Sequence, residues 1–152
     1  MMNTTTHPRR ALVVIDVQNE YDSGNLRIEY PPVADSLRRI GRAMDAAHTA
    51  GIPVIVVQQT APAESPLFAA GSRGWELHEV VASRPHDHYV AKQLPSAFAG
   101  TDLGEWLQQH DIDTLAVVGY MTHNCDDTTI KHAFDAGLQV EFYYPERRRS
   151  AA

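Results

Sequence analysis

A chain of 152 residues, 43% hydrophobic and 21% charged, is long enough to bury one core and has the composition of an ordinary globular domain. Its formal net charge of −6 argues against a nucleic-acid surface, which needs a basic patch. The single cysteine, Cys125, excludes an internal disulfide and a cysteine-based zinc site, and it fits a reducing compartment. We expect one domain over residues 1–152, with a disordered lead at 1–8 and a tail at 146–152.

The sequence has no apolar stretch that approaches the ~20 residues of a membrane span. Its first apolar run covers only residues 11–15 before Asp16 interrupts it, which is shorter than the core of about 7–15 residues in a signal peptide. We therefore expect a cytoplasmic protein whose partners include neither a membrane nor a nucleic acid.

Short apolar runs along the chain predict the strands of a sheet. Residues 11–15 are rich in β-branched side chains and do not alternate with polar ones, as in a parallel strand that is buried on both faces. Comparable runs, which we expect to be the other strands, lie at residues 53–58, 88–92, 114–119 and 139–143.

Helices are expected between these strands. An apolar stripe with helical spacing predicts a first helix that ends at Gly51, and its members are Val33, Leu37, Ile40, Met44 and Ala47. Thr101 or Asp102 is expected to cap a second helix. Asn124 is expected to cap a third helix, which ends at Gly137.

The least regular part of the chain is the stretch from residue 60 to residue 83, where prolines and glycines predict a long loop. A short helix is expected within it, at residues 76–82. Loops of this length in a compact domain are often functional.

Strands that alternate with helices predict a three-layer α/β/α sandwich, Rossmann-like, around a mostly parallel sheet of five to six strands. Such sheets bind ligands outside the carboxyl ends of their strands. Asp16 follows the first strand, Lys92 ends the third, and Cys125 follows the fourth. The three side chains are therefore expected at the same edge of the sheet.

Each of these three residues also has an ordinary structural interpretation. The Asp16 carboxylate could cap a helix or accept hydrogen bonds from a loop. Lys92 could be a solvated residue at the end of a strand, and Cys125 could be a small buried hydrophobic residue. Their combination is more informative, because a thiol with a pKa of about 8.5 is stabilised as a thiolate by a nearby ammonium and by a helix N-terminus. Asp16 could accept the thiol proton and return it later. Asp126 and Asp127 would raise the pKa of the thiol if they face it, because a nearby negative charge disfavours the thiolate.

Other kinds of site are not supported by the sequence. The turn after the first strand has no glycine, which excludes a dinucleotide site and a phosphate-binding loop of the P-loop type. His86, His88 and His123 lack a preformed set of ligands, and a solvated loop explains them better than a metal site. We expect no cofactor and no metal.

Three segments together resemble the isochorismatase-like cysteine hydrolase family, and the resemblance extends over residues 11–142. Residues 15–21 (Ile-Asp-Val-Gln-Asn-Glu-Tyr) are similar to the first-strand motif of that family. Residues 92–103, with Lys-Gln-Leu-Pro-Ser-Ala-Phe at their start, are similar to its lysine motif. Residues 119–125 (Gly-Tyr-Met-Thr-His-Asn-Cys) are similar to its nucleophile motif, and matching positions follow at Thr129, Ala133, Asp135 and Gly137.

The resemblance implies a catalytic triad of Asp16, Lys92 and Cys125 that cleaves an amide-type C–N bond through a covalent intermediate. It also implies a cis peptide between Tyr120 and Met121, with the backbone N–H groups of Met121 and Cys125 as the oxyanion hole. The residues that it implies around the small-molecule substrate are Tyr21, Gln59, Trp75, Phe98 and Tyr120. Core packing is an equal alternative for Trp75 and Phe98.

Two departures from the family leave other functions open. Asp126 stands where the family has an apolar residue, and the chain ends before the closing elements that relatives have. A non-catalytic, ligand-binding relative is therefore an alternative, as is an isochorismatase-type hydrolase of a vinyl ether. A thiol redox sensor is a weaker one, because the chain has no second cysteine. The resemblance also implies a homo-oligomer, either a dimer or a tetramer. The Asp/His pattern that binds a metal in nicotinamidases is not visible in the sequence.

Overall fold

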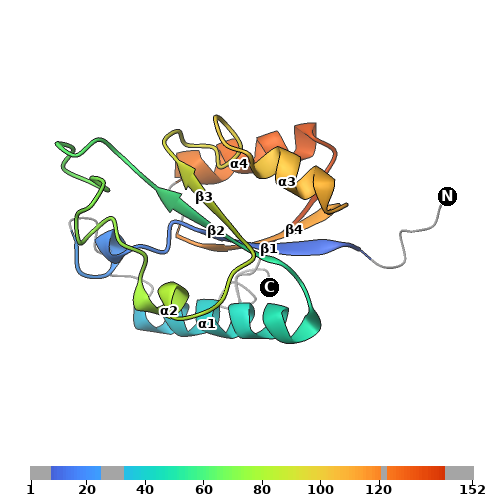
Figure 1. Cartoon of the computed structure of the whole chain (residues 1–152), viewed down its shortest axis with the longest axis horizontal. Coiled ribbons are helices and arrows are strands. Elements are labelled where there is room, and N and C mark those ends of the chain that lie inside the picture. Colours follow the sequence, from blue (N-terminus) through green and yellow to red (C-terminus); the bar gives the residue numbers. More distant parts are fainter. Residues whose placement is uncertain (1–7, 25–32, 121–122, 143–152) are drawn as a thin grey trace, which may run out of the picture.

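The computed structural model describes residues 8–24, 33–120 and 123–142. Within them five parallel strands form one sheet in the order β3-β2-β1-β4-β5 (Figure 1). The strands are β1 (Arg10–Ile15), β2 (Val54–Gln59), β3 (His88–Lys92), β4 (Thr114–Gly119) and β5 (Gln139–Phe142). The predicted strands are therefore present, each within one or two residues of its expected bounds.

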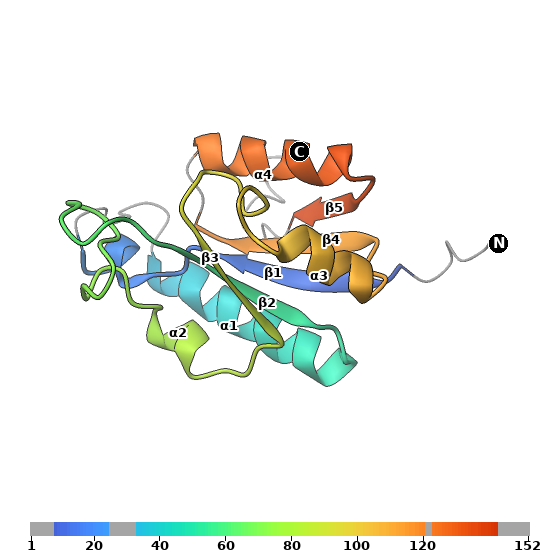
Figure 2. The same cartoon turned by 45° about the horizontal axis from the view of Figure 1, so that its top comes forward.

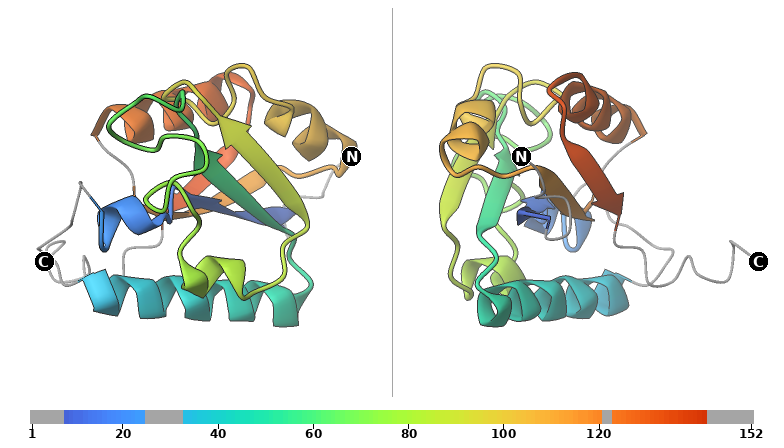
Figure 3. Two further views of the ribbon diagram at one scale, coloured as in Figure 1. Left: turned by 60° about the vertical axis from the view of Figure 1, so that its left-hand side comes forward. Right: turned by 90° about the vertical axis from the view of Figure 1, so that its right-hand side faces the viewer.

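Helices cover both faces of the sheet, which confirms the predicted three-layer α/β/α class (Figures 1 and 3). The helices are η2 (Asn19–Tyr21), α1 (Val33–Ala50), α2 (Glu79–Ala82), α3 (Leu103–Gln109) and α4 (His123–Asp135). On one face, α1 buries Leu37, Ile40 and Met44 against Val54 and Val56 of the sheet. The stripe predicted from the sequence is therefore the buried side of this helix.

On the opposite face, the core forms between the sheet and the helices α3 and α4. Leu103 and Leu107 of α3 and Ala133 of α4 pack with Val13 and Ile15 of the central strand β1. Because β1 has side chains in both cores, it is buried throughout from Ala11 to Ile15. This explains why its sequence shows a continuous apolar run with no alternation.

Two helix starts differ from the sequence expectation. α2 begins at Glu79 instead of residue 76, because the backbone of Glu76 and Leu77 pairs with the chain beyond β1. His78 caps it, accepting a hydrogen bond from the Val80 N–H through Nδ1 at 3.1 Å. α4 begins at His123, so Asn124 lies in its first turn and is not its N-cap.

Asp102, one of the two expected caps of α3, occupies the N-cap position, but its side chain makes no capping hydrogen bond. The hydroxyl of Thr101, the other candidate, accepts a hydrogen bond from the Leu103 N–H at 3.2 Å. The predicted lead, apart from Pro8, and the predicted tail lie outside the described residues.

Candidate active site

Asp16 lies directly after β1, where the chain leaves the sheet. Its N–H donates to the Val57 carbonyl at 2.9 Å, and its side chain is 2% exposed. Its φ is +59°, in the left-handed region that a residue with a side chain seldom adopts. Such conformations persist where the surrounding structure holds them, and they concentrate at functional sites.

Lys92 is the last residue of β3, and its side chain is completely buried. Its Nζ lies 3.3 Å from Asp16 Oδ2, reaching over β2, the strand that separates β3 from β1. A buried ammonium is tolerated only when it is paired and hydrogen-bonded, because its desolvation is costly. The structure therefore brings together two of the three predicted catalytic residues as a buried ion pair.

Gln59 lies between the two charged residues, at the end of β2. Its Oε1 accepts a hydrogen bond from Lys92 Nζ at 2.5 Å, and its Nε2 lies 3.5 Å from the Gln93 carbonyl. The family resemblance places this residue around the substrate, and that role stays a prediction. In the described residues its carboxamide contacts Lys92 and the Gln93 carbonyl.

Gln18, which the sequence did not single out, ties this part of the site together. Its Oε1 accepts from the Gln59 N–H at 2.9 Å, and its Nε2 donates to the carbonyls of Gln59 and Trp75 at 2.9 and 2.7 Å. The side chain is 1% exposed. A polar residue three positions after a buried strand could have indicated such a role, but its partners lie far away along the chain.

Cys125 lies in the first turn of α4, and the structure describes the backbone but not the side chain at this position. The side chains of Asp126 and Asp127 likewise lie outside the part of the chain that the structure describes. Met121, and with it the predicted peptide bond after Tyr120 and half of the oxyanion hole, lies outside the described residues.

The strand that leads to Cys125 is fixed against β1. Gly119 pairs with Ile15, and the Tyr120 N–H donates to the Ile15 carbonyl at 3.0 Å. Gly119 has a φ of +126°, and a Cβ there would collide with the Ile15 carbonyl oxygen. Only glycine allows this close approach. β4 therefore ends beside Asp16, which follows Ile15.

The loop after Lys92 is attached to α4. The Ala97 N–H donates to Thr129 Oγ1 at 3.1 Å, and the Ser96 hydroxyl lies 3.1 Å from His132 Nδ1. Thr129 is four residues after Cys125, which is one helical turn, and it is buried. These contacts connect the lysine segment to the helix that contains the cysteine.

The aromatic residues predicted around the substrate lie in different surroundings. Tyr21 and Tyr120 are buried in the core beside α1, with ring centroids 5.5 Å apart. Phe98 is buried in the opposite core, with its ring 5.1 Å from that of His132. Trp75 is half-buried, and its Nε1 donates to Thr60 Oγ1 at 3.0 Å. A role in substrate binding stays a prediction for all four.

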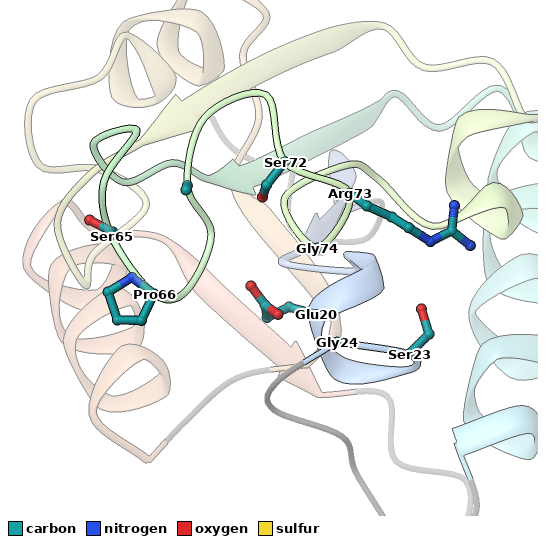
Figure 4. A pocket seen from close by; sticks show the side chains of 9 residues that line it. Glu20, Ser23, Gly24, Ser65, Pro66, Ser72, Arg73 and Gly74 are labelled. Atoms are coloured by element: carbon teal, nitrogen blue, oxygen red, sulfur yellow. The ribbon is translucent and has the colours of Figure 1, made fainter.

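A hollow of about 210 Å³ lies between η2 and the loop over residues 65–74 (Figure 4). Figure 2 shows this loop beside the turn that follows β1. Glu20 lines the hollow and is 3% exposed, and its Oε2 accepts a hydrogen bond from the Phe68 N–H at 2.8 Å. A Cβ at Gly74 would collide with this carboxylate. Glu20 therefore fastens the loop to η2, and none of the predicted site residues lines this hollow.

Across residues 8–24, 33–120 and 123–142, no group of three or more His, Cys, Asp or Glu residues could hold a metal ion. None of the helices described is long and apolar enough to cross a membrane.

The arrangement defines a class of protein: a parallel α/β enzyme fold with a buried acid–lysine pair at the carboxyl edge of its sheet. Residues 10–142 match the model of the isochorismatase domain. The chain belongs to the isochorismatase family, as its motifs predicted.

Known relatives agree with this assignment. A proposed isochorismatase from Burkholderia xenovorans LB400, known as a crystal structure, is 67% identical with a TM-score of 0.86, over 89% of this chain and 65% of that one. The secreted isochorismatase effector Isc1 of Verticillium dahliae is 30% identical over 91% of this chain and 72% of its own length. Streptothricin hydrolase of Streptomyces noursei is 35% identical over 86% of this chain and 46% of its own length.

These relatives support the predicted enzyme class, an isochorismatase-like hydrolase. The chain spans 65% of the Burkholderia protein and 46% of the streptothricin hydrolase. The activities of these relatives therefore belong to chains that are longer than this one.

Proposed function

We propose that this protein hydrolyses an amide-type C–N bond of a small molecule, with Cys125 as nucleophile and with Asp16 and Lys92 as its catalytic partners. The observation that carries the proposal is the buried ion pair between Lys92 Nζ and Asp16 Oδ2, at 3.3 Å. Its two side chains are 0% and 2% exposed, at the edge of the sheet where ligands bind. Burying a charged pair is a poor way to gain stability, which favours a chemical role for it.

The position of Cys125 in the chain supports its role as the third member. It lies in the first turn of α4, where the positive end of the helix dipole favours an anion such as a thiolate. β4 leads to this helix from a position beside β1, and the loop after Lys92 is attached to it through Thr129. Both partners therefore have a structural connection to the cysteine.

The proposed reaction has two halves. Asp16 accepts the thiol proton, and the Cys125 thiolate, stabilised by the Lys92 ammonium, attacks the carbonyl carbon of the substrate. The C–N bond breaks, Asp16 returns the proton to the leaving nitrogen, and an acyl thioester remains on the sulfur. Asp16 then takes a proton from water, whose oxygen attacks the thioester. The carbon–sulfur bond breaks, the acid is released, and the proton returns to the thiol.

The negative oxygen that forms in both halves needs hydrogen-bond donors. The family resemblance assigns this role to the backbone N–H groups of Met121 and Cys125. Losing one such donor typically lowers the rate about 10²–10³-fold. A small molecule as substrate agrees with the name of the relative from Streptomyces noursei, streptothricin hydrolase.

The test is an activity screen with amides, ureas and carbamoyl compounds, in which the protein is also analysed by intact mass after short reaction times. We expect turnover and a transient mass increase equal to the acyl group. The increase should be absent in Cys125→Ala, and because the chain has one cysteine, its location is unambiguous. Iodoacetamide should also label Cys125 faster than free cysteine at pH 7.

The matched control uses the two lysines of the chain, Lys92 and Lys131. Lys92→Met should abolish turnover, whereas Lys131→Met, at an exposed position of α4, should leave it unchanged. Full activity in Cys125→Ala would refute the proposed nucleophile. Cleavage of vinyl ethers alone, without any mass adduct, would favour an isochorismatase-type reaction.

A further inference from the structure

We infer that Gln59 is a positioning residue that holds the Lys92 ammonium toward Asp16, and that Gln18 holds Gln59 in place for this purpose. The inference rests on the proposed function for its chemistry, although its geometry stands by itself. It replaces the role in substrate contact that the sequence suggested for Gln59.

The ammonium of Lys92 has three protons to donate and no access to solvent. The acceptors around it are Gln59 Oε1 at 2.5 Å, Asp16 Oδ2 at 3.3 Å and, more distantly, the Leu94 carbonyl at 3.5 Å. Gln59 Oε1 is thus a hydrogen-bond acceptor of the buried ammonium beside the Asp16 carboxylate. It helps to direct the lysine side chain without adding a charge.

The carboxamide of Gln59 can face Lys92 in only one orientation. An ammonium has no acceptor, so the oxygen of the carboxamide must point toward it and the NH₂ group away from it. The NH₂ group points toward the Gln93 carbonyl, at 3.5 Å, in the residue that follows Lys92. The same side chain thus contacts both the lysine and the backbone of its neighbour.

The side chain of Gln18 holds the backbone of Gln59 in place. Its side-chain amide pairs with both the N–H and the carbonyl of Gln59, each at 2.9 Å. Gln18 lies two residues after Asp16, so the segment that contains the carboxylate also fixes the residue that orients the ammonium. The relative placement of Asp16 and Lys92 is therefore determined through Gln18 and Gln59 as well as by their direct contact.

A neutral acceptor suits the proposed chemistry better than a second carboxylate would. The ammonium keeps its charge available to the Cys125 thiolate, because Gln59 orients it without neutralising it. A carboxylate at the same place would hold the lysine equally well but would compete with the thiolate for its charge.

The direct test observes Lys92 by NMR in protein labelled with ¹³Cε- and ¹⁵Nζ-lysine. Only two lysine signals exist, and the exposed Lys131 is an internal reference. In the wild type we expect two distinct Hε resonances for Lys92, as for a fixed side chain. In Gln59→Leu they should merge as the side chain becomes mobile, while the Lys131 signal is unchanged. Gln59→Met serves the same purpose if Gln59→Leu does not fold.

Gln58→Leu is the matched control. Gln58 is the neighbouring glutamine of β2, is 4% exposed, and has two side-chain hydrogen bonds, to the Trp75 carbonyl at 2.8 Å and to the Tyr89 hydroxyl. Neither bond involves Lys92. This variant should lose thermal stability to a degree comparable with Gln59→Leu, but its Lys92 resonances should stay distinct.

Kinetics give the second measurement. Gln59→Leu should lower kcat about ten- to a hundredfold, as expected for the loss of a hydrogen bond to a charged group, with KM within about twofold of the wild type. Gln59→Glu should restore the distinct Hε resonances without restoring kcat. A rise in KM with unchanged kcat would overturn the inference and return Gln59 to the substrate pocket.

The two proposals can fail separately. Distinct Lys92 resonances in Gln59→Leu would refute the positioning role, whether or not the protein turns over any amide. Merged resonances in that variant, together with a wild type that cleaves no amide and forms no adduct, would support the positioning role and refute the proposed hydrolysis.

Discussion

The two halves of the molecule on either side of β1 are built differently. In the β1–β2–β3 half, buried polar side chains form a connected network in which Asp16, Lys92, Gln59 and Gln18 contact one another. In the β4–β5 half, among the residues of α4 whose side chains are described, only Thr129 and Ala133 are buried, and Phe134 is 58% exposed. The charged pair thus lies in one half, whereas the cysteine lies in the first turn of the helix that belongs to the other.

The proposed triad therefore depends on the contacts that join the two halves. Three of the contacts that join the halves in the described residues are the close approach of Gly119 to Ile15, the hydrogen bond between Ala97 and Thr129, and the surface ion pair between Arg10 and Glu141. Each of these three contacts, called joints below, can be removed by one substitution. The buried polar network around Asp16 and Lys92 can be disrupted without changing any of the joints.

The largest effect is expected from breaking the network itself. Lys92→Met should lower the free energy of unfolding by about 3–5 kcal/mol, because it leaves the buried Asp16 carboxylate without its cation. Urea denaturation measures this. Lys131→Met should stay within about 0.5 kcal/mol of the wild type, since this residue is exposed. Equal stabilities of the two variants would contradict the structural importance of the pair.

The second-largest loss of stability is expected at the contact between β4 and β1. Gly119→Ala should cost about 3 kcal/mol, because a Cβ at φ +126° collides with the Ile15 carbonyl oxygen. Gly137→Ala is the control: its φ is +86°, but nothing lies within 4 Å of an added Cβ. It should cost about 1 kcal/mol, from conformation alone. Thermal unfolding of both variants distinguishes the collision from the conformational cost.

A smaller effect is expected at the joint between the lysine loop and α4. Thr129→Val keeps the volume but leaves the buried Ala97 N–H without its acceptor, which should cost about 1–3 kcal/mol. Thr129→Ser keeps the oxygen and should restore most of the loss. Hydrogen exchange of the Ala97 amide reports the joint directly, and it should accelerate only in the valine variant.

The smallest effect concerns the ion pair that connects β1 with β5. The hydrogen bond and charge of Arg10 lower the pKa of Glu141, whose Oε1 lies 2.8 Å from Arg10 Nε. A carboxyl group whose pKa is lower in the folded state adds stability above its unfolded pKa, and this is lost as the pH falls through the folded pKa. The difference in melting temperature between the wild type and Glu141→Gln should therefore be positive at pH 7 and shrink toward pH 3. Both groups are exposed, so the difference is small.

Much of this fold could be predicted from local patterns. The run before Asp16 is apolar without alternation because β1 is buried on both faces, and the stripe in α1 repeats with the helical period because one side of the helix packs on the sheet. Asp16 and Lys92 were placed at one edge because parallel strands end together. The start of α2 was missed because Glu76 and Leu77 pair with a distant segment, which no local pattern reveals.

The fold class, the family and the edge at which the polar residues gather can all be inferred from the sequence, since each follows from short-range periodicity or from contiguous motifs. Which of these residues touch one another depends on the three-dimensional arrangement. The strand order β3-β2-β1 brings Lys92 over Gln59 to Asp16 and lets Gln18 close the network. Contacts between residues so far apart in the chain depend on strand order and side-chain direction, which neither periodicity nor composition encodes.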